Sequence, residues 1–227
     1  MSATMKALSI NDHVSKVHLI IASMFTFFGT GLVVNLYLQS IFLTFAAIIS
    51  SFVLIFAIAF NTNETKKKLY TSLLALAMGF SGSILIEEAN MENPQIVWLS
   101  LLGMALLFVT FTAASKLIQD SAQATLGAFL FSSLLISIIS SMAFIFSPAS
   151  SRQYITMNFF SLIIFCGYVA YDTKEMYTKF ADPLDKHDHY HHAINMFLNL
   201  INIFYKLMKL LTLFSQKNKK EKDEKKN

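Results

Sequence analysis

Charge is scarce in this sequence and unevenly placed. Only 14% of the 227 residues are Asp, Glu, Lys or Arg, whereas a soluble domain usually carries about 25%. Long stretches hold no charged residue at all, and most charges lie between these stretches or at the two ends of the chain. This distribution excludes an ordinary soluble core and is typical of a membrane protein.

Cysteine and enzyme motifs are also nearly absent. The single Cys166 lies in an apolar run, so neither an internal disulfide nor a cysteine metal cluster is expected. We find no Gly-x-Ser-x-Gly, no His-Glu-x-x-His, no glycine-rich phosphate loop and no pair of aspartates inside the apolar runs. The net charge of +4 comes largely from one short lysine-rich tail, which argues against nucleic acid as a partner. We therefore expect no enzyme, no cofactor and no nucleic-acid binding.

Seven apolar runs fill most of the chain. Their approximate limits are Val17–Tyr37, Ile41–Phe60, Leu69–Ile86, Ile96–Ala114, Ala122–Phe146, Ile155–Tyr171 and Ala193–Phe214. The first six hold no charged residue and approach or reach the roughly 20 residues that a helix needs to cross a bilayer. Because backbone groups in lipid must pair within their own element, we predict an all-α membrane protein, a bundle of six or seven transmembrane helices. Residues 1–16 then form an N-terminal segment, 17–214 the bundle and 215–227 a charged tail.

Lysines mark one side of the predicted membrane. They lie before the first run and after the second, fourth and sixth, at Lys6, Lys16, Lys66, Lys67, Lys68, Lys116, Lys174, Lys179 and Lys186. The loops of the opposite side hold Arg152 as their one basic residue, together with Glu87, Glu88 and Glu92. The positive-inside rule therefore predicts a cytoplasmic N-terminus. The same rule favours a cytoplasmic position for the lysine-rich tail, whereas a seventh crossing would place the tail outside. Whether the last run crosses the membrane fully therefore stays open.

The last apolar run carries a polar stripe. Five residues recur at steps of four, three, four and three, namely Asn195, Asn199, Asn202, Lys206 and Lys209. These steps place all five on one helical face. Because asparagines are poor residues to face lipid, we favour a helix packed inside the bundle, with Asn195 and Asn202 as candidate pore-lining residues. The alternative is an amphipathic helix lying at the membrane interface.

Several motifs resemble those of the Bax inhibitor-1 family, the transmembrane Bax inhibitor motif-containing proteins. The most specific are Phe165-Cys-Gly-Tyr168 leading into Tyr171-Asp-Thr173, and the stretch from Asn195 to Phe204. The resemblance implies a bundle with the last helix at its centre and residence in the endoplasmic reticulum membrane. It also implies protection against cell death, together with a pH-sensitive leak of calcium as the permeating ion.

In the family, a carboxylate at the end of the sixth span faces a carboxylate on the last helix, and the pair senses protons. Asp172 matches the first position, whereas Asn199 replaces the usual aspartate at the second. We predict that Asp172 and Asn199 form the proton-sensing gate. Carboxylate and amide oxygens are also suitable weak ligands for Ca²⁺. The alternative for Asp172 is a solvated helix end.

Two further groups are candidates for electrostatic roles. Glu87 and Glu88 end the third run and are a possible lumenal acidic mouth that attracts cations, or an ordinary solvated loop. Four histidines follow one another closely at His187, His189, His191 and His192. Imidazoles titrate near pH 6.5, so this loop is a candidate pH modulator. Its alternative is a solvated polar loop, and the spacing alone assigns no metal site.

Two classes of function remain open. The first is a cytoprotective calcium leak pathway. The second is a non-conducting membrane protein that binds apoptosis regulators of the Bcl-2 type. The lipid bilayer is the partner that the composition itself predicts, and no feature of the sequence predicts an oligomeric state.

Overall fold

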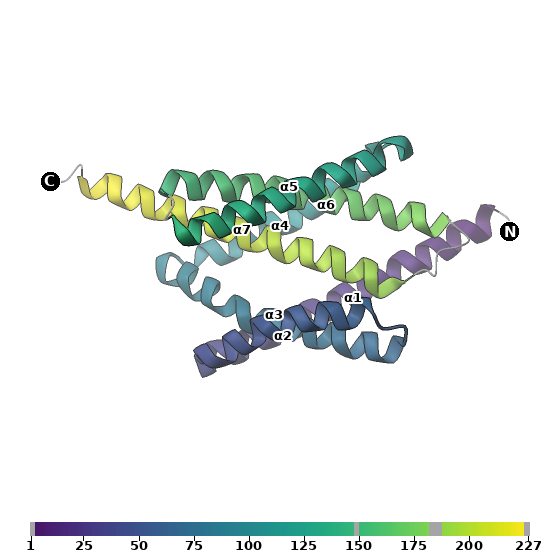
Figure 1. Cartoon of the computed structure of the whole chain (residues 1–227), viewed down its shortest axis with the longest axis horizontal. Helices are drawn as coiled ribbons and strands as arrows, with labels where there is room; N and C mark the ends of the chain where they lie inside the picture. Colours follow the sequence, from purple (N-terminus) through teal and green to yellow (C-terminus); the bar gives the residue numbers. More distant parts are fainter. Residues whose placement is uncertain (1–2, 148–149, 182–187, 225–227) are drawn as a thin grey trace. The chain divides into compact units, whose positions relative to one another are not determined.

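The structure, a computed structural model, describes residues 3–147, 150–181 and 188–224. Over these ranges the chain forms seven α-helices and one short 3-10 helix, and no strand (Figure 1). The helices are α1 (Ala3–Leu38), α2 (Ile41–Ala59), α3 (Glu64–Glu92), α4 (Gln95–Ala114), η1 (Ser115–Leu117), α5 (Asp120–Phe146), α6 (Ser151–Ala181) and α7 (His189–Glu224). The predicted all-α class is confirmed.

All seven α-helices in the described part of the chain are long and apolar enough to cross a membrane. Several extend past the predicted runs because polar residues continue the helix beyond the hydrocarbon. α1 begins at Ala3 rather than near Val17, and α6 continues to Ala181 instead of ending near Tyr171. α7 runs without a break through residue 214, where the sequence suggested the start of a tail.

The chain divides into two compact units. The first contains residues Met1–Glu87 and Met176–Phe197, and the second Glu88–Glu175 and Leu198–Asn227. The first unit therefore holds α1, α2, most of α3 and the start of α7. The second holds α4, α5, most of α6 and the rest of α7. Three helices, α3, α6 and α7, contribute residues to both units.

In the first unit, two glycines bring the backbones of α1 and α3 together. A Cβ added to Gly31 would lie 2.2 Å from the carbonyl oxygen of Leu76, and one added to Gly79 would lie 2.0 Å from that of Phe28. No side chain fits at such distances, so only glycine permits this approach. Small residues serve in this way where membrane helices pack closely.

A buried amide lies at the same helix contact. Asn35 of α1 is 3% exposed, and its Nδ2 lies 2.8 Å from Thr44 Oγ1 of α2, 2.7 Å from Ser83 Oγ and 2.9 Å from the carbonyl oxygen of Phe80, both of α3. One amide thus links three helices of the first unit. Sequence reasoning did not single out Asn35, because a lone asparagine in an apolar run gives no periodic signal.

The second unit has an apolar core. Cys166 and Val169 of α6 and Ile203 of α7 are buried together. Partly buried side chains pack around them, namely Met104, Leu107, Phe108, Phe111, Leu162, Phe165 and Leu207. This cluster closes the contact between α6 and α7 on one side of the candidate site.

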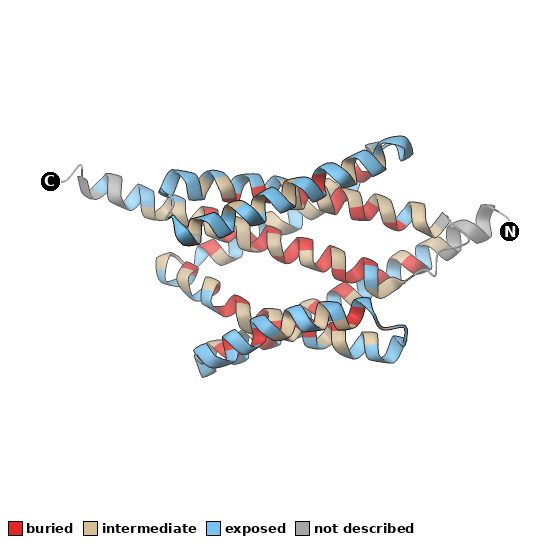
Figure 2. Ribbon diagram, in the orientation of Figure 1, coloured by how far each residue is buried: buried red, intermediate tan, exposed pale blue. Residues whose placement is uncertain are grey.

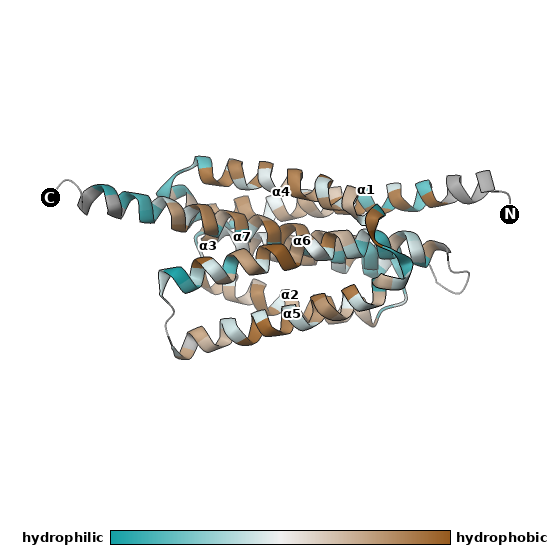
Figure 3. Ribbon diagram, turned by 90° about the horizontal axis from the view of Figure 1, so that it is seen from above, coloured by the Kyte–Doolittle hydropathy of each residue, from teal (hydrophilic) through white to brown (hydrophobic). Residues whose placement is uncertain are grey.

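α7 is the most buried of the seven spans in the described chain. Half of the most apolar stretch of α7 is buried, a larger share than in any other of these spans. Figure 2 shows buried residues along its middle, and Figure 3 shows its C-terminal end turning hydrophilic. This burial favours the packed helix over the interfacial one that the sequence left open.

Candidate functional site

Asp172 lies inside α6, nine residues before the helix ends at Ala181. The expectation that it marks the end of the sixth helix was wrong, because α6 continues through residues that are too polar for the apolar run. Its side chain is 6% exposed, so it is not a solvated helix end. The next residue, Thr173, is also buried and donates its hydroxyl to the carbonyl oxygen of Val169 at 2.7 Å.

Asn199 of α7 faces this carboxylate. Its side chain is 7% exposed, and its Nδ2 donates a hydrogen bond to Asp172 Oδ2 at 2.5 Å. The structure therefore brings together the two residues that the family resemblance paired. An ionised carboxylate can accept hydrogen bonds but cannot donate them, so the amide of Asn199 acts as the donor.

The surroundings of the pair differ in polarity. One turn away along each helix lie Val169 and Ile203, both fully buried in the apolar cluster. In the other direction along α6, Lys174 forms a salt bridge with Asp120 at the start of α5, at 2.6 Å. Asp172 and Asn199 thus lie between the apolar cluster on one side and the salt bridge of Lys174 with Asp120 on the other.

The other two asparagines of the stripe bond within their own helix. Asn195 Nδ2 lies 3.3 Å from His191 Nε2, and Asn202 Nδ2 donates to the carbonyl oxygen of Leu198 at 2.8 Å. Both side chains are half-buried. The stripe on α7 is therefore interrupted: Asn199 reaches across to α6, whereas Asn195 and Asn202 satisfy their amides locally.

The basic end of the stripe meets the acidic end of α3. Lys209 Nζ lies 2.7 and 2.9 Å from the two carboxylate oxygens of Glu88. Glu92 accepts a hydrogen bond from Ser215 at 2.8 Å and forms a salt bridge with Lys219 at 2.7 Å. Glu87 is exposed. Of the two residues of the predicted mouth, Glu88 thus has a lysine as its partner.

Sequence reasoning missed this pairing because the partners lie 121 residues apart along the chain. The available signal was charge: an acidic end on the third apolar run and lysines on the last. Lys206 lies on the same face, one turn before Lys209, and makes no salt bridge within the described residues. An intramembrane lysine of this kind is unusual enough to be a candidate for function.

The predicted histidine loop is largely the first turn of α7. His189, His191 and His192 lie in this turn, and His187 falls outside the described residues. Asp188 caps the helix, because its Oδ1 accepts hydrogen bonds from the backbone N–H groups of Tyr190 at 3.0 Å and His191 at 3.2 Å. Asp188 also forms a salt bridge with Lys67 of α3. Burial alone would raise the pKa of Asp188, but the hydrogen bond from Lys67 and its charge hold that pKa below its usual value.

His13 of α1 joins these histidines, which the sequence did not suggest. Its ring centre lies 4.4 Å from that of His189, 5.5 Å from that of His192 and 5.2 Å from that of Phe180. The rings pack against one another in the first unit. Among the described residues, no group of three or more His, Cys, Asp or Glu is placed to hold a metal ion.

Comparison with known proteins identifies the family. The family described as "Inhibitor of apoptosis-promoting Bax1" matches residues 10–218, most of the chain. The chain belongs to this family. The chain is also similar to the BI1-like protein of Arabidopsis thaliana, with which it is 33% identical over 112 residues, 49% of this chain and 42% of the relative.

Two other relatives match over longer stretches. The Arabidopsis Protein LIFEGUARD 4 is 29% identical over 139 residues, covering 59% of this chain and 50% of the relative. Human Bax inhibitor 1 is 27% identical over 143 residues, covering 62% of this chain and 59% of the relative. The chain thus spans about half the length of the curated relatives it matches. Membership in the Bax inhibitor family fits seven apolar helices and integral membrane insertion.

Proposed function

We propose that this protein is a cytoprotective membrane protein that opposes cell death by providing a pH-sensitive calcium leak in the endoplasmic reticulum. The observation that carries the proposal is the hydrogen bond between Asp172 and Asn199, buried between two membrane-spanning helices. The family's name supports the anti-apoptotic role. The endoplasmic reticulum and the calcium leak follow from the family resemblance.

The chemistry of the pair supports a gate. A carboxylate inside a membrane protein is costly, and such residues mark ion or proton pathways. Asp172 offers oxygen ligands for Ca²⁺, and the amide oxygen of Asn199 is a further ligand if the amide turns. Protonation of Asp172 removes its charge and changes the bond to Asn199. The apolar cluster at Val169 and Ile203 is the barrier that such a change would have to open.

Purified protein in liposomes loaded with a calcium dye tests the proposal. We expect a calcium flux that depends on pH between about 5 and 8, a range that covers carboxylate and imidazole titration. Asp172→Asn should largely abolish this pH dependence. If the histidines were the sensor, the combined replacement of His187, His189, His191 and His192 would flatten the curve instead. An absence of flux at every pH would contradict the leak.

The basic end of α7 favours a second candidate function, that of a non-conducting protein that binds apoptosis regulators of the Bcl-2 type. Lys206 lies on the stripe that would line the path and makes no salt bridge within the described residues, whereas Lys209 is paired with Glu88. The positive charge of Lys206 opposes the passage of a divalent cation. The liposome experiment separates the two. If neither the wild-type protein nor Lys206→Met gives a calcium flux, the result would favour the interaction protein.

Orientation in the membrane is a further part of the proposal. The distribution of lysines places the N-terminus and the segment around Asp185 in the cytoplasm. Single cysteines at Ser9 and Asp185, in a Cys166→Ala background, should react with an impermeant thiol reagent in sealed vesicles whose cytoplasmic side faces outward. Protection of both sites in intact vesicles would reverse the orientation.

A further inference from the structure

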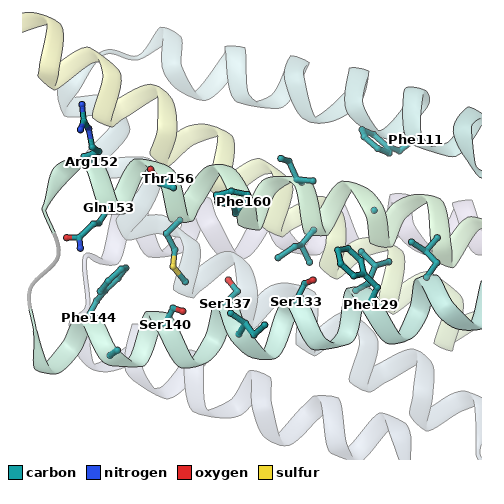
Figure 4. A pocket seen from close by; sticks show the side chains of 18 residues that line it. Phe111, Phe129, Ser133, Ser137, Ser140, Phe144, Arg152, Gln153, Thr156 and Phe160 are labelled. Carbon is teal, nitrogen blue, oxygen red and sulfur yellow. The ribbon is translucent and has the colours of Figure 1, made fainter.

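A large apolar groove lies in the second unit, apart from Asp172 and Asn199. Its volume is about 990 Å³, at the upper end of the ~300–1,000 Å³ typical of ligand pockets. α5 and α6 form most of its wall, and Phe111 of α4 closes one part of it (Figure 4). Both α5 and α6 contain membrane spans. Three residues of its wall, Phe129, Ile136 and Phe160, are more than half exposed, so the groove is open at the apolar surface of these spans.

The sequence explains why the groove is hollow. Between Phe129 and Phe144, the face of α5 that lines the groove carries three small residues, Ser133, Ser137 and Ser140. Figure 4 shows these serines between the two aromatic rings. Ser137 Oγ lies 2.8 Å from Ser161 Oγ of α6, which holds the two helices together beside the hollow. Small side chains at three successive turns leave a space that leucines would fill.

The length of the groove fits a lipid chain. Phe129 and Phe144 are 15 residues apart on α5, which corresponds to about 22 Å at a rise of ~1.5 Å per residue. One leaflet of the hydrocarbon core is about 15 Å thick, half of ~30 Å. The groove is therefore longer than one leaflet is thick, and an acyl chain that crosses its leaflet can lie in the groove along the whole length of the chain.

One end of the groove carries a charge. Figure 4 places Arg152 and Gln153, from the first turn of α6, at the same end as Phe144. Arg152 is exposed, and it is the one basic residue between Lys116 and Lys174. It forms no salt bridge with any described carboxylate. A guanidinium group matches a phosphate bidentately, so this end is complementary to an anionic headgroup.

We infer that the groove between α5 and α6 binds an anionic phospholipid, with its phosphate at Arg152 and one acyl chain along Ser140, Ser137 and Ser133. A soluble ligand does not suit the groove, because its wall is almost entirely apolar and lies within two membrane spans. A helix from a partner or a second copy would cover the apolar wall but leave Arg152 without an anion.

A tryptophan reporter tests this site directly. The chain has one tryptophan, Trp98, so Trp98→Phe with Phe144→Trp places the reporter at the charged end of the groove. The full chain is reconstituted in phosphatidylcholine nanodiscs that contain spin-labelled phosphatidylglycerol or, at the same mole fraction, spin-labelled phosphatidylcholine. We expect about a fivefold stronger apparent binding of the anionic lipid, the effect of one basic residue at a membrane surface.

Matched variants give this result its meaning. Arg152→Gln should reduce the preference to about one, Arg152→Lys should keep most of it, and Lys116→Gln should leave it unchanged. Ser140→Phe, which fills the groove, should reduce quenching by both lipids. Equal quenching by the two lipids in the parent protein, or a preference that survives Arg152→Gln in folded protein, would overturn the site. Weak quenching by both lipids together with crosslinked dimers would show that a helix occupies the groove instead.

Discussion

The contact between α1 and α3 in the first unit differs in kind from the contact between α6 and α7 in the second. The first depends on Gly31 and Gly79, which let two backbones meet, and its buried amide, Asn35, bonds to uncharged groups. The second buries an ionisable group, Asp172, against Asn199 beside an apolar cluster. Both contacts bury polar side chains, but of the residues named here only Asp172, in the second contact, is ionisable.

The two contacts therefore differ in how they should respond to pH. A contact closed by glycines and a neutral amide gives a fixed geometry that does not depend on pH. A contact that contains a carboxylate in a membrane has two states with different charge, and the balance between them depends on pH and on the neighbouring group. The comparison therefore predicts that mutations in the first contact change stability and that mutations in the second change pH response.

The largest expected effect is on stability, from Gly79→Ala. The added methyl would meet the backbone of Phe28 at 2.0 Å, and backbone atoms cannot move aside as a side chain can. Overpacking typically costs about 1–3 kcal/mol, and we expect the upper end of this range. Thermal unfolding in detergent measures the loss.

Gly29→Ala is the matched control: Gly29 lies on α1, the partner helix of Gly79, and no atom of the described chain lies within 4 Å of its Cβ position. Alanine is the better helix former by about 1 kcal/mol, so this variant should be as stable as the parent or more stable. Equal losses for Gly79→Ala and Gly29→Ala would mean that the close approach of α1 and α3 does not determine stability.

The next effect sharpens the chemical side of the comparison. Asn199→Asp places a second carboxylate against Asp172, and two carboxylates in contact hold a shared proton to higher pH. The midpoint of the pH-dependent calcium leak should move upward by about one unit or more. Leak rates in liposomes from pH 5 to 8 give the midpoint.

Asn195→Asp is the control for this shift, since the amide of Asn195 contacts His191 of its own helix, whereas that of Asn199 bonds to Asp172 of α6. It should move the midpoint much less than Asn199→Asp does. Superimposable curves for the parent and Asn199→Asp would remove Asp172 and Asn199 from the gate and with them the contrast between the two contacts.

Much of the fold and the central pair were predictable from the sequence. The apolar runs located all seven α-helices of the described chain, because membrane insertion depends on composition over about 20 residues. The pairing of Asp172 with Asn199 came from family resemblance. Helix ends were less predictable: α6 passes Asp172 by nine residues, because polar residues can continue a helix into the interface.

Other contacts were not predictable, and the reasons are physical. Glu88 and Lys209 meet across 121 residues of chain, and hydropathy does not say which helix ends lie side by side. His13 belonged to the predicted N-terminal segment, yet it packs against His189. The glycines of α1 look alike in the sequence, but only the partner helix distinguishes Gly31 from Gly29.

A smaller effect tests whether the first contact is indifferent to pH. Asn35→Leu removes an amide that bonds to three acceptors, and interhelical hydrogen bonds in membranes are worth about 0.6–2 kcal/mol. We expect about 1 kcal/mol, since Thr44 and Ser83 keep their own bonds to backbone carbonyls. The Oδ1 of Asn35, which has no hydrogen-bond partner among the described residues, is also removed. The loss should be the same at pH 5 and pH 8, and a loss that varied with pH would contradict the comparison.

The smallest effect concerns an ionisable group at the edge of the first unit. Lys67 holds the pKa of Asp188 below its usual value, although burial opposes this. A carboxyl whose pKa is lowered in the folded state stabilises the protein above its unfolded pKa of about 3.9 and loses that contribution as the pH falls through the folded pKa.

Asp188→Asn keeps a helix cap, because asparagine caps as well as aspartate, but loses the salt bridge with Lys67. Since Asp188 is about one-third exposed, solvent weakens the pair, and we expect a loss of at most about 1 kcal/mol. Melting temperatures of parent and variant should differ from pH 7 down to about pH 4 and converge only as the pH falls further, through the lowered folded pKa of Asp188. A difference that grew on acidification would show that Asp188 acts through something other than its charge.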